Sequence, residues 1–307
     1  MECPMRLIIV GASGMMGSVL NTAARASQKE VIGTYYSHKR EGLLRYDMRK
    51  ESLGSVIPGI GPQDTVYLLS AYTNVAWIYA HQDQASELNL HATKRLIDEL
   101  AQAGARIIFL SSVEVFDGEH GNYNENSPPN PLTSYGRMKF AIEKYLLEKK
   151  CKSCIVRIGW RVGWDIDSPC VVKFTYNTLM APGAKMAKDN IFSVIDDKDT
   201  CEGLLRLSDR TEVAICHLAS VPPIVRTELA SMVMKFSKYK ERMSFEAVSF
   251  ADIPYTEKRS RDTHLDNSFA ISSLGMDFRP PEDIIRQKVE MLDRHMEQSL
   301  LCGKIKS

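Results

Sequence analysis

Three residues near the middle of the chain, Ser112, Tyr135 and Lys139, have the side chains needed to move a proton to or from a carbonyl oxygen. A free phenol has a pKa of about 10 and is a poor acid-base group at neutral pH until a nearby ammonium stabilises its anion. Lys139 follows Tyr135 by four residues, so both can lie on one face of a helix. A serine hydroxyl can donate to the same oxygen, and the set therefore predicts oxidoreduction at a carbonyl carbon.

Spacing alone does not select this pair. Four tyrosine–lysine pairs share the spacing, namely Tyr35/Lys39, Tyr46/Lys50, Tyr135/Lys139 and Tyr145/Lys149. Tyr135 differs because a proline-rich loop, residues 126–134, precedes it and because Ser112 ends an apolar run 23 residues earlier. Tyr145 would lie about 15 Å farther along the same helix and face another direction, so we expect it to pack or to lie on the surface.

A glycine-rich turn near the start of the chain has the pattern G-x-x-G-x-x-G. It lies between a predicted strand over residues 6–10 and a predicted helix over residues 14–25. Glycine permits the tight turn and lets the backbone approach a pyrophosphate at a helix N-terminus. We therefore expect a dinucleotide coenzyme to contact Gly11, Ser13, Gly14, Met15, Met16 and Gly17.

The second predicted strand, residues 31–36, indicates which coenzyme this is. Sites for NAD usually have an acidic residue at the end of that strand, and none is present here. Instead the strand leads into Ser37, His38, Lys39 and Arg40, whose hydroxyl and cations suit the extra phosphate of NADP. The loop favours NADP, with NAD as the alternative coenzyme and a solvated basic loop as the non-functional interpretation.

Elements that could position these residues alternate between strand and helix. Strands are expected at 65–70, 105–111, 154–158 and 213–219, with helical patterns at 85–103 and 135–150. This alternation predicts an α/β fold, a Rossmann-type doubly wound parallel sheet, with a smaller mixed C-terminal substrate lobe. Ligands of such sheets bind at the carboxyl ends of the strands, where the candidate residues follow.

The lobe boundaries follow from where the alternation weakens. We expect the dinucleotide-binding part to cover residues 1–160 and about 189–221, and the substrate lobe to cover about 161–188 and 222–290. Residues 160–188 are expected to be irregular, residues 226–238 to form a helix, and residues 291–307 to form a C-terminal helix or tail.

Composition restricts the class of partner. The 307 residues include 39 basic and 38 acidic ones, and this balance predicts neither nucleic-acid nor membrane-surface binding. No apolar run is long enough to span a bilayer, the first four residues show no signal-peptide pattern, and seven scattered cysteines suit reduced thiols, so we expect a cytoplasmic protein. Cys151 and Cys154 form a lone CxxC motif, which we interpret as a helix end and a buried strand start, and we expect no metal site.

These motifs together resemble the extended short-chain dehydrogenase/reductase superfamily, and the middle of the chain is similar to the dTDP-4-dehydrorhamnose reductase family. The similarity rests on Ser111–Gly118, Gly121–Glu125, Asn130–Leu132 and Ser134–Lys139, and continues weakly through Ala71–Val75, Val156–Trp160 and Thr263–Ser268. The resemblance implies an NADP-dependent reduction of a nucleotide-linked keto-sugar, with Tyr135 as the proton donor to the C4 oxygen.

By the same resemblance, further residues gain roles. Asp47 and Met48 would contact the adenine, and Ala71, Tyr72 and Thr73 the inner half of the coenzyme. Ser112, Val113 and Trp160 would lie at the sugar. Trp160, Arg161 and Arg261 are candidates for the base or the diphosphate, although Trp160 could equally be a core residue and both arginines merely solvated.

Two departures from the family pattern leave the substrate open. Val113 and Glu114 stand where the family usually has Asp and Tyr, and Ala76 stands where it usually has Asp. The sequence therefore also allows a reductase or epimerase acting on another sugar nucleotide. A third alternative is a regulatory subunit without catalysis, because the family includes the beta regulatory subunit of methionine adenosyltransferase. The assembly, a homodimer or otherwise, is left open.

Overall fold

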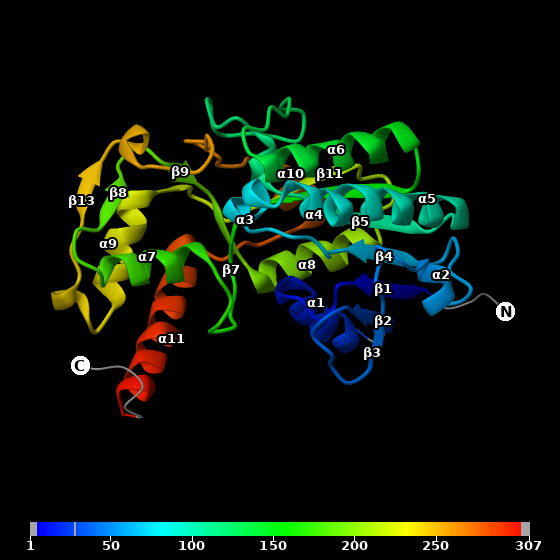
Figure 1. Ribbon diagram of the computed structural model, residues 1–307, viewed down its shortest axis with the longest axis horizontal. Coiled ribbons are helices and arrows are strands. Elements are labelled where there is room, and N and C mark those ends of the chain that lie inside the picture. The colour runs from blue at the N-terminus through cyan, green and yellow to red at the C-terminus, as the bar shows by residue number, and fades with distance from the viewer. Residues whose placement is uncertain (1–4, 28, 302–307) are drawn as a thin grey trace.

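Seven parallel strands form one sheet in the order β11-β6-β5-β4-β1-β2-β3 in the computed structural model, which describes residues 5–27 and 29–301 (Figure 1). The strands are β1 Arg6–Val10, β2 Glu30–Tyr35, β3 Leu43–Arg45, β4 Thr65–Leu68, β5 Arg106–Leu110, β6 Ser153–Ile158 and β11 Ile215–Leu218. The order reverses between β1 and β4, where doubly wound sheets open a ligand crevice. The predicted Rossmann-type α/β class is confirmed. The predicted chain start at residues 1–4 and the tail beyond residue 301 lie outside the described residues.

Helices cover both faces of the sheet because each strand buries its alternate residues on opposite sides. In β1, Leu7 and Ile9 belong to one core, whereas Ile8 and Val10 belong to the other. The first core is closed by α1 Met15–Ala26, α8 Asp197–Ser208 and α10 Ser268–Leu274, and the second by α2 Leu53–Val56, α5 Thr93–Ala103 and α6 Ser134–Lys149. Figure 1 shows α5 and α6 on one side of the strands and α8 on the other.

The helical stretch predicted over residues 85–103 is interrupted. It consists of α4 Gln82–Ser86, a π-helical turn Glu87–Ala92 and α5, and it follows the short helix α3 Val75–Ala80. Asn89 lies on the π turn, and its amide group hydrogen-bonds both the N–H and the carbonyl of Tyr72 at 2.9 Å. The π-helical turn thus directs the Asn89 side chain to the backbone of Tyr72, and this contact holds the loop after β4 in place.

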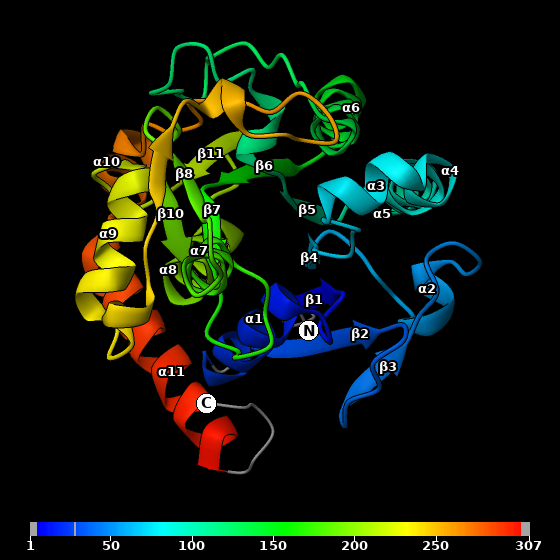
Figure 2. The same ribbon diagram turned by 60° about the vertical axis from the view of Figure 1, so that its left-hand side comes forward.

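A second group of elements has its own apolar core beside the sheet. Three strand pairs belong to it, formed by β7 Trp160–Val162 with β10 Val194–Asp196, β9 Ile191–Phe192 with β12 Ile224–Val225, and β8 Lys185–Ala187 with β13 Glu246–Val248. Helices α7 Val171–Leu179, α9 Arg226–Phe236 and α11 Pro281–Leu301 pack around them, and two 3₁₀ turns occur at Lys240–Arg242 and Phe250–Asp252. Figure 2 shows α9 and α11 together on one side of the molecule, with β2 and β3 on the other.

Two predictions about this second group are wrong. Residues 160–188 are not irregular, because they contain β7, α7 and β8. The C-terminal helix begins at Pro281 and not near residue 291, so the predicted boundary at residue 290 falls inside α11. Proline at the first helical position, followed by Glu282 and Asp283, favours a helix start there. The helix predicted over residues 226–238 is confirmed as α9.

Candidate active site

Tyr135 lies in the first turn of α6, and its backbone is fixed from two directions. Thr133 is the N-cap of the helix, and its hydroxyl oxygen accepts a hydrogen bond of 2.9 Å from the Gly136 N–H. Gly136 packs directly on the segment after β5, since a Cβ at this position would collide with the carbonyl oxygen of Glu114. The close contact brings the start of α6 against the carboxyl end of β5, where Ser112 lies.

Lys139 is buried one turn after Tyr135, as the shared helix face predicts. Its ammonium donates a 2.7 Å hydrogen bond to the carbonyl of Leu110, the last residue of β5. The ammonium nitrogen lies 4.6 Å from the centroid of the Phe109 ring and 5.7 Å from that of Tyr135. Both side chains of the predicted pair therefore meet the end of one central strand.

Burial shifts both groups toward their neutral forms. It raises the pKa of the Tyr135 phenol, and the negative charge of Glu114 raises it further, while a hydrogen bond with Ser112 lowers it. Burial also lowers the pKa of Lys139 to about 8, against an opposing effect of Glu143. The expected lowering of the tyrosine pKa by Lys139 is therefore absent, because desolvation and Glu114 dominate. Tyr135 is fully protonated at neutral pH, which suits a proton donor.

Ser112 follows β5 and is the N-cap of the 3₁₀ turn Val113–Val115. Its hydroxyl oxygen accepts a 3.2 Å hydrogen bond from the Glu114 N–H and also interacts with the Tyr135 hydroxyl. Val113 is buried in an apolar cluster against which Trp160 packs. The structure thus brings Ser112, Val113, Tyr135 and Trp160 into one neighbourhood, which sequence analysis assigned to the sugar.

The loop after β4 joins the same neighbourhood. Tyr72 packs against the small apolar cluster that contains Tyr135 and Met138. Its ring lies 4.5 Å, centroid to centroid, from that of Trp77. Ala71 and Thr73 flank it in the partly open loop. The loop predicted to contact the inner half of the coenzyme therefore lies beside Tyr135.

The glycine turn has the geometry of a phosphate cradle. Gly11 has a φ of +93°, and Gly17 leaves no room for a side chain because a Cβ there would collide with the Gly11 carbonyl oxygen. No side chain caps α1 at Gly14, so the first amide groups of the helix are available to an anion. Met15 is partly exposed at this end, and the Ser168 hydroxyl contacts its sulfur at 3.2 Å.

The loop after β2 is exposed from Tyr36 through Arg40. Within it, the Ser37 hydroxyl and the His38 ring are 2.9 Å apart. Behind the loop, Arg49 lies 4.5 Å from the Tyr36 ring centroid and holds the buried Asp47 carboxylate through two bonds of 2.9 and 3.1 Å.

This ion pair occupies the carboxylate of Asp47, a residue predicted to contact the adenine. Hydrogen bonds from Arg49 lower the pKa of Asp47, and Met48 beside it is buried. Arg49 is a residue that sequence analysis missed. Arg49 lies outside any regular helix or strand, so no periodic pattern in the sequence marked it as a partner of Asp47 or of the loop after β2.

The arginines proposed from sequence differ in their availability. The Arg161 guanidinium donates a 2.8 Å hydrogen bond to the buried carboxylate of Asp197 and a 3.0 Å hydrogen bond to the Ser168 hydroxyl. The Arg261 side chain is exposed and has no hydrogen bond or ion pair with the residues that the structure describes. Its backbone carbonyl accepts hydrogen bonds from the Ile191 N–H and the Asn190 side-chain amide.

A strap of residues 253–265 crosses the site and contributes groups that the sequence did not reveal. Glu257 accepts hydrogen bonds from the Ser134 N–H at 2.8 Å and the Ser134 hydroxyl at 3.1 Å, at the start of α6. Arg259 lies 3.5 Å from Glu114. Only the folded chain shows this proximity, because the strap lies more than 100 residues from α6 in sequence.

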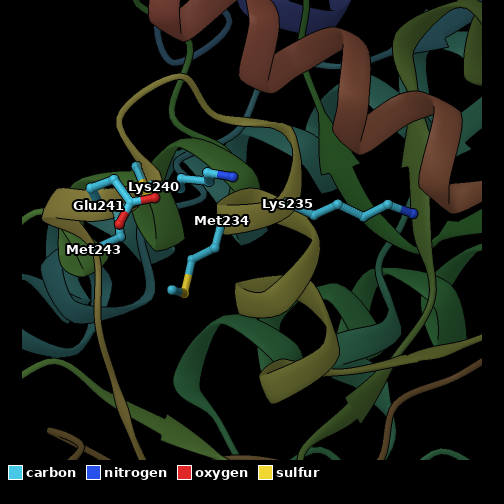
Figure 3. A pocket seen from close by; sticks show the side chains of 5 residues that line it. All are labelled: Met234, Lys235, Lys240, Glu241 and Met243. Atoms are coloured by element: carbon cyan, nitrogen blue, oxygen red, sulfur yellow. The ribbon is translucent and has the colours of Figure 1, made fainter.

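Two surface cavities lie away from these residues. One, of about 370 Å³, is an open hollow at the end of α9, lined by Met234, Lys235, Lys240, Glu241 and Met243 (Figure 3). The other, of about 610 Å³, lies at the amino end of β11 near Ala214 and Phe269. Neither contains a predicted site residue, so the carboxyl edge of the sheet is the better candidate for the chemistry.

The described residues hold no cluster of three or more histidine, cysteine or acidic side chains placed to bind a metal ion. Cys154, in the lone CxxC motif, is a free thiol whose pKa burial raises to about 12. Over the same part of the chain, no helix combines the length and apolarity needed to cross a membrane.

Comparison with known proteins gives matches along most of the chain. A family model described as RmlD substrate binding domain matches residues 5–293. Methionine adenosyltransferase 2 subunit beta of Bos taurus is 30% identical over 154 residues, which make up 50% of this chain and 46% of that protein. The chain thus spans about half the length of the curated relatives it matches.

Two solved structures extend the comparison to the fold. A hypothetical dTDP-4-dehydrorhamnose reductase from Sulfolobus tokodaii is 27% identical with a TM-score of 0.75, covering 91% of this chain and 99% of its own. A dTDP-4-dehydrorhamnose reductase from Bacillus anthracis str. Ames in complex with NADP is 18% identical with a TM-score of 0.77, covering 93% of this chain and 99% of its own. The second likeness supports the fold alone.

Proposed function

The chain belongs to the RmlD substrate binding domain family, and from this premise we propose that it is an NADP-dependent reductase of a nucleotide-linked 4-keto-6-deoxysugar. The observation that carries the proposal is the meeting of Ser112, Tyr135 and Lys139 at the end of β5. The similar protein from Sulfolobus tokodaii, described as a hypothetical dTDP-4-dehydrorhamnose reductase, supports the same substrate class.

Each residue of the set has a distinct task in this proposal. Tyr135 donates its proton to the C4 oxygen as that oxygen becomes an alkoxide. Ser112 donates a hydrogen bond to the same oxygen and stabilises the developing charge. Lys139 would hold the ribose of the coenzyme through its buried ammonium, one helical turn after Tyr135.

The residues of the glycine turn fit a dinucleotide. NADPH, when bound, supplies the hydride that reduces the keto carbon. Gly11 and Gly17 allow the tight packing of the turn, and no side chain caps α1 at Gly14. The free amide groups and the helix dipole at this end would stabilise a pyrophosphate. Lys39 and Arg40 are exposed in the loop after β2 and would hold the 2′-phosphate.

The division into lobes and the cellular location belong to the same proposal. The second apolar core around α7, α9 and α11 supports a separate substrate lobe, although α11 extends the lobe past residue 290. The five described cysteines are free thiols, which suits a reducing cytoplasm.

A panel of dTDP- and UDP-linked 4-keto-6-deoxysugars, followed by NADPH absorbance, tests the function. We expect one sugar nucleotide to consume NADPH in a 1:1 ratio with product. An epimerase would convert its substrate without net loss of NADPH, because it recycles the coenzyme. No consumption with any substrate of the panel would reject the reductase.

A second function has one specific observation in its favour, the 30% identity to methionine adenosyltransferase 2 subunit beta over half of the chain. In that case the chain would bind NADP and a catalytic partner without turning over a sugar. Affinity purification from the native cells distinguishes the two. A stoichiometric methionine adenosyltransferase partner, together with an inactive sugar panel, would favour the regulatory function.

A further inference from the structure

Arg226 begins α9 and is placed unlike the other arginines of the site. Its guanidinium carbon lies 4.6 Å from the Phe192 ring centroid and 5.0 Å from that of Trp160. Its hydrogen-bond acceptor is neutral, since the Nε–H and an Nη2–H both donate to the amide oxygen of Asn190, at 3.2 and 3.1 Å. Among the described residues, no carboxylate lies within ion-pair distance of it.

A cation in such surroundings is costly without an anion. Burial lowers the pKa of Arg226 to about 10, an effect that the nearby Tyr255 only partly opposes. Arg161, Arg157 and Arg279 differ, because each of these buried or half-buried arginines has its own carboxylate. The guanidinium of Arg226 retains hydrogen-bonding capacity that the protein does not use, since Nη1 has no partner among the described residues.

The Arg226 guanidinium lies close to the segment that contains Ser112, with Trp160 between them. Trp160 directly follows Gly159 at the carboxyl end of β6, and it packs against the cluster containing Val113, the neighbour of Ser112. Arg226 stacks on the ring of the same Trp160 and remains partly exposed. The ring of Trp160 thus lies between the Arg226 guanidinium and Val113, the neighbour of Ser112.

We propose that Arg226 is the anchor for the diphosphate of a nucleotide-linked substrate, with Trp160 and Phe192 holding its guanidinium and Asn190 fixing its orientation. The proposal rests on the proposed function for the identity of the reacting group, and it deepens that function by naming the residue that selects a diphosphate. Planar guanidinium groups bind phosphates through paired hydrogen bonds, which are strongest where water is excluded. Arg226 would replace Arg161 and Arg261, the candidates from sequence.

Direct binding measurements test the anchor without requiring turnover. Calorimetry with dTDP, UDP, thymidine and NADPH is to be performed on the natural protein, on Arg226→Gln and on Arg226→Lys. Loss of a charge-assisted pair should weaken dTDP and UDP by about 10- to 100-fold in Arg226→Gln. Thymidine and NADPH should bind unchanged, and Arg226→Lys should keep more diphosphate affinity than Arg226→Gln. Arg294→Gln, which changes an exposed arginine on α11, is the matched control and should bind all four ligands normally.

A chemical measurement on the natural protein covers the case in which the variants do not fold. Phenylglyoxal modification, read by mass spectrometry, should be blocked at Arg226 by dTDP and not by thymidine. Equal dTDP affinity in the natural protein and Arg226→Gln, or equal modification of Arg226 with and without dTDP, would overturn the anchor. A protein that binds dTDP through Arg226 yet oxidises no NADPH would reject the reductase while leaving the anchor in place.

Discussion

At the scale of single residues, the site buries ionisable groups whose charged forms are disfavoured in the folded chain. Tyr135 and Lys139 are both about 8% exposed, and burial favours the neutral form of each. Glu114 adds a negative charge near the phenol, and its own pKa is raised by burial. Such placement lowers stability and is retained where chemistry requires it.

Lys139→Met tests whether this lysine serves function and not stability. The pKa of Lys139 falls from 10.5 in the unfolded chain to about 8 in the folded one, so the protonated lysine costs about 3 kcal/mol of stability. This cost is fully present below pH 8 and disappears as the pH rises to 10.5. We expect the variant to lose turnover by at least about 100-fold, yet to unfold in urea at pH 7 no more easily than the natural protein.

Lys149→Met is the control on the same helix, because Lys149 pairs with Asp98 on the surface, far from the site. It should keep full turnover. A Lys139→Met protein that retains activity, or that loses several kcal/mol of stability at pH 7, would contradict the role given to Lys139.

At the scale of elements, the N-terminus of α6 sets the position of the proton donor. Thr133 caps the helix and also donates a 3.1 Å hydrogen bond to Glu114. Glu257 of the strap binds Ser134 from the other side. The first turn of α6 is therefore fixed to the 3₁₀ turn after β5 and to the strap by contacts within the protein alone.

Thr133→Ala removes the cap and the contact with Glu114. Loss of an N-cap hydroxyl should lower the free energy of unfolding by about 1 kcal/mol, and the misplaced first turn should lower kcat with little change in the Kd for NADPH. Thr133→Ser keeps the hydroxyl and should restore both. Urea unfolding measures the change in stability, and steady-state kinetics measure the change in kcat. If Thr133→Ala lowers the stability but leaves kcat unchanged, the cap does not position Tyr135.

The loop after β2 carries the coenzyme preference in this account. Replacing both Lys39 and Arg40 by alanine removes two exposed cations that would face the 2′-phosphate. We expect the Kd for NADPH to rise about 10-fold or more, while the Kd for NADH changes little. Lys198→Ala, an exposed lysine on α8, is the control. Equal losses for the two coenzymes would show that the loop does not read the phosphate.

At the scale of the whole molecule, alternating strands and helices made the sheet predictable. The glycine turn follows β1 and Ser112 comes shortly after β5, at the carboxyl ends of parallel strands, as the sequence pattern indicates. The sequence could not reveal β3, a three-residue edge strand whose residues are mostly exposed. It also missed α7, because Cys170 caps that helix through its sulfur, an unusual signal. Arg226 and Glu257 escaped notice since their importance depends on contacts between distant segments.

A buried polar network joins β6, β11 and α6 within the sheet part of the molecule and should govern acid stability. His217 on β11 lies 3.3 Å from an Arg157 nitrogen and 3.0 Å from the Tyr123 carbonyl oxygen, and Arg157 is paired at 2.7 Å with Glu143 on α6. Burial, and then the charge of Arg157, lower the pKa of His217 to about 3. Its neutral form is therefore the one that the folded protein holds.

The stability from His217 is full above pH 6.5 and is lost as the pH falls toward 3, because the unfolded chain takes up the proton first. Between pH 7 and pH 5 this group alone should remove about 2 kcal/mol. His217→Gln cannot be protonated and should lose that part of the pH dependence. Urea unfolding of both proteins at the two pH values checks it, and identical slopes would refute the assignment. Glu125 and Asp266 also act on His217, but both proteins retain them.

Hydride transfer from labelled NADPH tests the central claim most directly. The protein is incubated with NADPH that carries deuterium at both C4 positions of the nicotinamide and with the sugar nucleotide that gives turnover, and the product is examined by mass spectrometry. We expect a sugar nucleotide carrying one deuterium for each NADPH oxidised, and no such product from Tyr135→Phe, which should still bind NADPH. A reduced product without the label, or normal labelling by Tyr135→Phe, would contradict the account.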